Sequence, residues 1–190
     1  MKLFIGLFVL AIGVTMGTSA ALAQSDMKSD GNPMVGGAAM YKTKNIVENA
    51  MNSKDHTTLV AAVKAAGLVD TLTGAGPFTV FAPVNSAFDK LPAGTVDTLL
   101  KPENKAMLTG ILTYHVVAGK MDSKAIAKAI KKGKGKAELT TVAGGKLTAM
   151  MDGTNLILMD EKGGRSMVTI ADVRQSNGVI HVIDTVLMPN

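Results

Sequence analysis

The chain has 190 residues, a hydrophobic content of 47% and a formal net charge of +5, and it contains no cysteine and no tryptophan. The lack of cysteine excludes a disulfide framework and thiol chemistry, so the fold has to be stabilised by its own apolar core. An aromatic content of only 4% predicts that this core is mainly aliphatic.

Residues 1–23 have the pattern of an export signal. Lys2 precedes an apolar run over residues 3–14, and a small-residue cleavage motif, Ala-Leu-Ala, occupies residues 21–23. The apolar run is too short for a comfortable membrane span. We therefore expect cleavage near Ala23-Gln24 and an exported mature protein, periplasmic or extracellular, without a transmembrane segment.

Residues 24–40 are rich in serine, aspartate, glycine and methionine and show no periodic apolar positions. This composition predicts a flexible linker, followed by one folded domain over residues 41–190. About 150 residues are enough for a single domain that buries roughly two-thirds of its unfolded surface.

The first half of this domain carries helical patterns. An apolar stripe over residues 59–63 is ended by Gly67, because glycine readily adopts the left-handed conformation that closes a helix. Further helices are predicted over residues 95–100 and from Pro102 to about Val116, with His115 on the apolar face of the second.

One strand is predicted among these helices. Residues 78–82 follow a Gly-Pro turn and form a short apolar run, which indicates a buried strand. Pro83 ends this strand because proline has no backbone N–H to donate. Asn85 then has the position and side chain of an N-cap for a short helix that carries Phe88.

A basic segment, Lys120–Lys136, contains seven lysines and one aspartate. It predicts a helix that starts at Asp122-Ser123, with isoleucines facing inward and lysines outward. A solvated helix face is one interpretation. The other is attraction of anionic polysaccharide or lipid headgroups, carried by the lysines Lys128, Lys131, Lys132 and Lys134.

After Ala137 the pattern changes to short strands separated by glycine-containing turns, and Asn177-Gly178 is a strong hairpin signal. In residues 179–187 both alternating faces are apolar, with His181 and Asp184 on opposite sides, which is typical of a central strand. Helices in the first half and strands in the second predict an α+β fold.

No pattern indicates catalysis, a cofactor or a metal. The sequence has no Gly-x-Ser-x-Gly, phosphate-binding glycine loop or His-Glu-x-x-His motif, and His56, His115 and His181 lie far apart in sequence. Nucleic acid is disfavoured as a partner, because the lysine segment contains no aromatic residue for stacking bases.

Three blocks resemble the fasciclin domain, in the family's order. Residues 78–88 resemble its first box, residues 112–119 its central Tyr-His motif, and residues 171–172 with 177–189 its second box. The resemblance covers residues 41–189, and one departure is Val84, where the family usually has threonine. The lead-in Val-Gly-Gly-Ala-Ala-Met40 resembles small exported bacterial members of one domain.

The resemblance implies a wedge of two β-sheets with several helices packed at one side. It implies a non-catalytic, monomeric module of cell adhesion or matrix and envelope binding, without cofactor, whose partner is a protein or a glycan. The residues that carry the structural motif are Phe78, Phe81, Pro83, Asn85, Phe88, Asp172, Asn177, Gly178, His181 and Asp184.

The Tyr-His motif allows two interpretations. In animal fasciclin domains this neighbourhood is proposed to bind integrins, and the resemblance implies a binding rim of Leu112, Tyr114, His115 and Val116. The alternative is that Tyr114 and His115 are buried, with their polar atoms hydrogen-bonded to the backbone.

Overall fold

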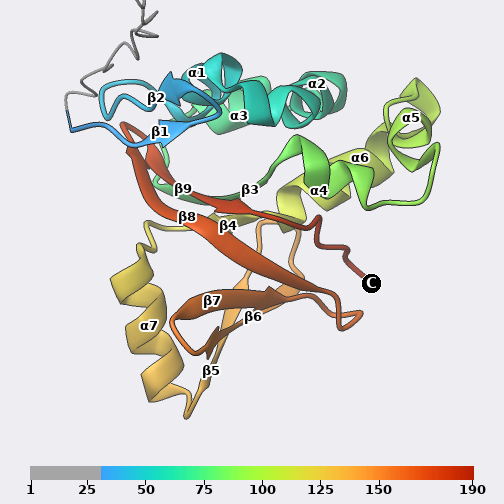
Figure 1. Cartoon of the computed structure of the whole chain (residues 1–190). Coiled ribbons are helices and arrows are strands. Elements are labelled where there is room, and N and C mark those ends of the chain that lie inside the picture. The colour runs from blue at the N-terminus through green and yellow to red at the C-terminus, as the bar shows by residue number, and fades with distance from the viewer. Residues whose placement is uncertain (1–30) are drawn as a thin grey trace, which may run out of the picture.

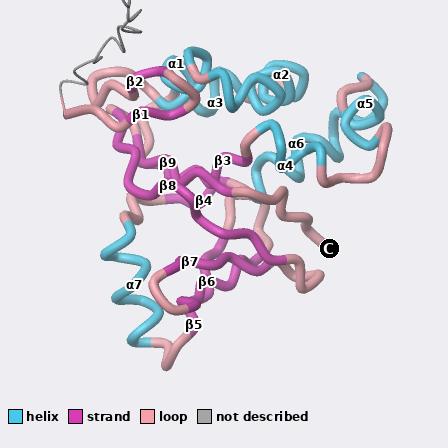
Figure 2. The backbone as a smooth tube through the Cα atoms, in the orientation of Figure 1, coloured by secondary structure: helices cyan, strands magenta, loops and turns pink. Residues whose placement is uncertain are grey.

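The computed structural model describes residues 31–190 and shows helices gathered on one side of a strongly twisted sheet (Figure 1). Figure 2 shows the strands in the middle of the molecule, with one further helix, α7, standing apart from the others. The arrangement confirms the predicted α+β class. The expected signal peptide and residues 24–30 of the expected linker lie outside the described residues.

Seven α-helices and two 3-10 helices are present in residues 31–190. The α-helices are α1 Ile46–Asn52, α2 Thr57–Ala66, α3 Val69–Thr73, α4 Asn85–Asp89, α5 Thr95–Leu99, α6 Lys105–Tyr114 and α7 Ser123–Lys132, and the 3-10 helices are η1 Lys54–His56 and η2 Pro102–Asn104. The stop predicted at Gly67 is confirmed, since this residue follows α2 with a φ of 72°.

Nine strands form a small hairpin and one large mixed sheet in the described part of the chain. The strands are β1 Met34–Val35, β2 Ala38–Ala39, β3 Phe78–Pro83, β4 Val116–Ala118, β5 Lys136–Thr140, β6 Lys146–Asp152, β7 Asn155–Met159, β8 Arg165–Gln175 and β9 Gly178–Ile183. The large sheet has the order β4-β3-β9-β8-β7-β6-β5, in which only β3 and β9 are parallel.

The long strand β8 joins the two halves of this sheet. Its first residues pair with β7, and from Val168 onward it pairs with β9 through two register shifts. Asp172 lies in the second shift with a φ of 61°. Bulges bend and twist a strand, so the two halves diverge as the predicted wedge (Figure 1).

Two apolar clusters lie on opposite faces of the central strand β9. The first packs α1 to α6 against one face and includes Ile180 and Val182. The second lies between the diverging halves and under α7, and it includes Phe81, Ile126 and Ile183. Every residue of β9 is buried, which confirms the prediction of a central strand.

The segment from Met34 to Met40 corrects the prediction of a flexible linker. It forms the β1–β2 hairpin, with Met40 only 2% exposed and Val35 buried in the first cluster. The carbonyl of Gly36 accepts a hydrogen bond of 3.1 Å from the Lys54 amide, which anchors the hairpin to η1. Two-residue strands are too short to produce a periodic pattern, so composition alone was misleading here.

Two predicted element boundaries are also wrong. The helix expected to reach Val116 ends at Tyr114, and Val116 begins β4, which pairs with β3. The strand expected to reach Leu187 ends at Ile183. In both cases the apolar pattern continues past the end of the helix or strand, because the residues that follow, such as Val116 and Leu187, are also buried.

Asn85 does not cap its own helix. Its Oδ1 accepts hydrogen bonds from the Thr58 amide at 3.0 Å and from the Thr57 hydroxyl at 3.2 Å, while its Nδ2 donates to the Lys54 carbonyl at 2.8 Å. Asn85 therefore caps α2, whose own N-cap residue makes no side-chain capping bond.

Candidate functional site

Tyr114 ends α6 inside the wedge and is fully buried. Its hydroxyl donates to the Lys146 carbonyl at 2.7 Å and accepts from the Glu161 amide at 3.2 Å. Burial raises the pKa of this phenol to about 12. Tyr114 thus connects α6 to the first residue of β6 and to the turn before β8, which is a structural role.

His115, the next residue, is also buried and hydrogen-bonded through both ring nitrogens. Its Nε2 accepts from the Leu187 amide at 3.0 Å, so Nδ1 carries the proton and donates to the Ile111 carbonyl at 2.8 Å. Burial lowers the pKa of His115 to about 4. The imidazole is therefore neutral at pH 7.

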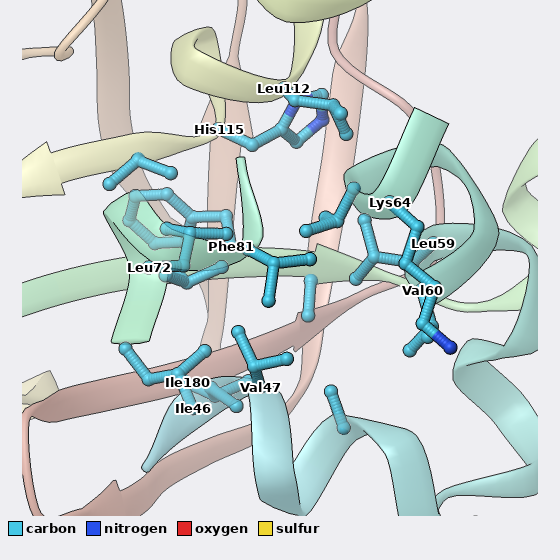
Figure 3. A pocket seen from close by; sticks show the side chains of 16 residues that line it. Ile46, Val47, Leu59, Val60, Lys64, Leu72, Phe81, Leu112, His115 and Ile180 are labelled. Carbon is cyan, nitrogen blue, oxygen red and sulfur yellow. The ribbon is translucent and has the colours of Figure 1, made fainter. Parts of the chain in front are cut away.

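Leu112, His115 and Val116 line a small apolar cavity of about 40 Å³ (Figure 3). Aliphatic side chains from α1, α2 and β9 point toward the same space, and β3 contributes Val80, Phe81 and Ala82 to the lining. This volume is far below the roughly 300–1,000 Å³ that is usual for ligand sites. The cavity is too small for a cofactor in this conformation.

The four residues of the expected binding rim are buried. The four side chains Leu112, Tyr114, His115 and Val116 are 5%, 0%, 3% and 6% exposed. The structural interpretation of the motif is the one that fits the geometry. The exposed apolar neighbour is Val142, 47% exposed, whose amide donates to the Val116 carbonyl at 2.7 Å, and no sequence pattern singled it out.

Asp172 and His181 hold α7 against the sheet. The Asp172 carboxylate accepts from the Ser123 amide at 2.6 Å and from the Ser123 hydroxyl. His181 Nε2 hydrogen-bonds the Met121 carbonyl at 2.8 Å, and its ring stacks on Phe81 at a centroid distance of 5.6 Å. Burial lowers the pKa of His181, which favours the neutral ring.

Asp184 follows β9 and contacts β8 and Lys90. Its carboxylate accepts from the Met167 amide at 2.9 Å and lies 3.6 Å from the Lys90 amino group. Burial alone raises the pKa of this carboxyl, but the hydrogen bonds and Lys90 outweigh it, so the pKa lies below its ordinary value. Asp184 and His181 do not contact each other.

Asn177 and Gly178 join the hairpin to the helical layer. Asn177 Oδ1 accepts from the Ile46 amide at 3.0 Å, and its Nδ2 donates to the Leu72 carbonyl at 2.8 Å. A side chain at position 178 would overlap the Phe78 carbonyl oxygen. The remaining motif residues Phe78, Pro83 and Phe88 belong to β3 or α4, and all three are at least partly buried.

Four lysines of the basic segment lie on the outer face of α7, whereas Lys120 precedes this helix, Lys134 lies in the turn after it and Lys136 begins β5. We define this lysine face as Lys120, Lys124, Lys128, Lys131, Lys132, Lys134 and Lys136, all of which are exposed. Within residues 31–190 none of them forms a salt bridge. The predicted orientation is confirmed, because Ile126 and Ile130 are buried beneath the helix and Asp122 caps it at 2.9 Å.

In the described part of the chain, no group of three or more His, Cys, Asp or Glu side chains is placed to hold a metal ion. No helix found in residues 31–190 has the length and hydropathy needed to cross a membrane.

Comparison with known proteins gives a consistent result. The Fasciclin domain model matches residues 54–189. Protein sll1483 of Synechocystis is 43% identical over 182 residues, covering 96% of this chain and 94% of the relative. Cell surface glycolipoprotein MPB83 of Mycobacterium bovis is 40% identical over 145 residues, covering 74% of this chain and 58% of the relative.

The fold has a counterpart among solved structures. A FAS1 domain pair from the insect cell adhesion molecule Fasciclin I matches with a TM-score of 0.67 and 19% sequence identity. The match covers 76% of this chain and 51% of that one, and at this identity it establishes the fold alone.

Proposed function

Because this chain belongs to the fasciclin family, we propose that it is an exported, non-catalytic interaction module of the cell envelope or extracellular matrix. It acts as a monomer in adhesion or envelope binding, and its partner is a protein or a glycan. The cell-surface location named for the mycobacterial relative and the signal pattern of residues 1–23 support export.

The observation that carries this proposal is the lysine face of α7. Tyr114, His115, Asn177, His181 and Asp184 make internal hydrogen bonds. These seven lysines, in contrast, are exposed and lack salt-bridge partners within residues 31–190. A dense positive surface attracts and orients acidic partners. A partner could contact the buried Tyr114 and His115 only if the fold opened locally, whereas it can reach the lysine face directly.

A second candidate function follows from the same surface. Anionic polysaccharide or an anionic lipid headgroup offers closely spaced negative charges, and the lysine face offers closely spaced positive ones. Binding of this kind depends steeply on ionic strength, since exposed charges are screened over roughly 10 Å at 0.1 M salt.

The test uses the mature chain, residues 24–190, in pulldowns from envelope fractions and on a glycan array at low and high salt. The variant replaces Lys128, Lys131, Lys132 and Lys134 with Gln. Loss of a saturable interaction in the variant supports the lysine face. Unchanged binding by the variant would refute the lysine face as the binding surface, but the interaction function would stand. Absence of binding by the wild type would refute both the lysine face and the interaction function.

A further inference from the structure

An open groove of about 380 Å³ lies beside α7, where the two halves of the sheet part. Its volume falls in the range of roughly 300–1,000 Å³ that is usual for ligand sites. The lining residues come from α7, from β8 and from β6 and β7 with the turn between them: Ser123, Lys124, Ala127, Met151, Thr154, Asn155, Leu156, Val168, Thr169 and Ala171.

The groove marks the place where a β-ladder stops early. β7 and β8 share three pairs, and the last of them is Ile157 with Met167. The same register, continued by two residues, would pair Leu156 with Val168 and Asn155 with Thr169. Neither pair forms, because β8 bends away through its register shift after Val168.

All four of those residues line the groove, together with Met151, Thr154 and Ala171 on the sheet side. The strand edges there face each other without a ladder between them. An edge without a partner is a template for an added strand. The groove is thus open to a short extended segment that enters between β7 and β8.

The side chains around the groove are of two kinds. Small or aliphatic groups, among them Ala127, Leu156 and Val168, line it together with the hydroxyls and amide of its polar residues. Lys124 is the charged lining residue among the described residues, and Lys128 follows one turn later on α7.

Two of the carboxylates near the groove are already engaged. Asp172 is held by Ser123, and Asp122 caps α7 and lies 3.4 Å from Arg174. Asp152, in the hairpin of β6 and β7, is exposed and forms no salt bridge within residues 31–190, but it is not a lining residue. The charge in the lining itself is therefore positive.

We propose that this groove binds an extended, acidic segment of a protein partner, which adds a short strand at the fork of β7 and β8. The inference rests on the proposed interaction function and specifies its partner chemistry. Aliphatic side chains of the segment pack beside Leu156 and Val168, and an acidic side chain pairs with Lys124.

A peptide fits these observations better than the two anionic alternatives. A polysaccharide or lipid headgroup would use the lysines alone and gain nothing from the parted strand edges. A peptide uses both, because its backbone supplies the donors and acceptors of a ladder while alternate side chains point to opposite faces.

The test is a titration of the mature chain with an eight-residue fluorescent peptide of alternating valine and glutamate. Binding is followed by fluorescence anisotropy and by backbone amide NMR shifts. We expect saturable binding with shifts concentrated at residues 154–156 and 168–171. An alternating valine–glutamine peptide and a polyuronate serve as comparison ligands, the second representing an anionic glycan.

Two pairs of variants separate the groove from general charge. Lys124→Gln should weaken peptide binding by about threefold, as expected for loss of one exposed ion pair. Lys132→Gln, which removes the same charge outside the groove, should change it less. Ala127→Leu fills the groove and should reduce binding at least tenfold. Lys132→Leu puts the same side chain on α7 outside the lining and should bind the peptide as Lys132→Gln does.

Several results would overturn the inference. One is a set of amide NMR shifts spread over the lysine face alone. Another is an equal loss of peptide binding in Lys124→Gln and Lys132→Gln. A third is competition by the polyuronate at the same amides, together with unchanged peptide binding by Ala127→Leu. If envelope pulldown persists in Ala127→Leu while the peptide fails to bind, the proposed function stands and the groove inference falls.

Discussion

The ring Nε2 of His115 accepts a hydrogen bond of 3.0 Å from the backbone N–H of Leu187, 72 residues further along the chain. This bond exists only while the imidazole is neutral, because a protonated Nε2 is a donor. It fastens the segment after β9 to the end of α6, with Leu187 itself fully buried.

Stability should therefore fall in mild acid. The pKa of His115 is about 4 in the folded chain against 6.5 ordinarily, so the unfolded state takes up the proton first. The contribution of neutral His115 to the free energy of unfolding is complete above pH 6.5 and is lost as the pH falls toward 4. The loss is roughly 3 kcal/mol, because each unit of pKa shift corresponds to about 1.36 kcal/mol. Urea unfolding at steps from pH 8 to pH 4 measures this loss.

His115→Gln provides the comparison for that experiment. Burial also lowers the pKa of His56 and His181, so part of the acid sensitivity belongs to those rings and persists in the variant. An identical pH dependence in wild type and His115→Gln would contradict the assignment to His115.

Tyr114→Phe should destabilise the fold by about 1–3 kcal/mol, the usual cost of leaving buried polar groups unpaired. The change removes the partner of both the Lys146 carbonyl and the Glu161 amide. Tyr41→Phe is the matched control, since Tyr41 is 42% exposed. Equal unfolding midpoints for the two variants would show that the Tyr114 hydroxyl contributes nothing.

Asn85→Ala should cost about 1–2 kcal/mol through loss of a helix cap, and the effect should appear in α2. Amide hydrogen exchange distinguishes the two helices. The Thr58 amide, which donates to Asn85, should lose protection, while the amides of α4 keep theirs. The opposite pattern would restore the original prediction that Asn85 caps its own helix.

Two glycine substitutions should have opposite signs. Gly178→Ala should destabilise by about 1–3 kcal/mol, because the new methyl group overlaps the Phe78 carbonyl. Gly110→Ala, within α6 and facing open space, should stabilise by about 0.5–1 kcal/mol through helix propensity. Thermal unfolding of both variants is sufficient, and destabilisation by Gly110→Ala would refute the second expectation.

Features determined by neighbouring residues could be predicted from the sequence. Gly67 ends α2, Asp122 caps α7, and the turn at Asn177-Gly178 joins β8 to β9 as the local chemistry indicates. In each case the deciding contact lies within a few residues, so spacing and residue type are enough.

Features determined by distant partners could not be predicted in this way. Asn85 has the residue type of a cap, but its partners lie 27 and 28 positions earlier, on α2. Burial of Tyr114 and His115 with backbone hydrogen bonds is one of the two predictions from the sequence, and the structure agrees with it. Their partners Lys146, Glu161 and Leu187 could not be predicted, because no local pattern connects them to the motif. The groove has no signal in the sequence, because it arises where two strand pairs of β7 and β8 do not form.

The parallel pairing of β3 with β9 also constrains the order of events during synthesis. Phe78 is aligned with Gly178, so the middle of the sheet forms only when the last strand is available. Contacts between distant residues make folding slow, and incomplete chains leave apolar surface and strand edges uncovered. A nascent chain that reaches only Asn177 lacks β9 entirely and cannot complete the core. The centre of the sheet can thus form only after residues 178–183 have been synthesised and can reach β3.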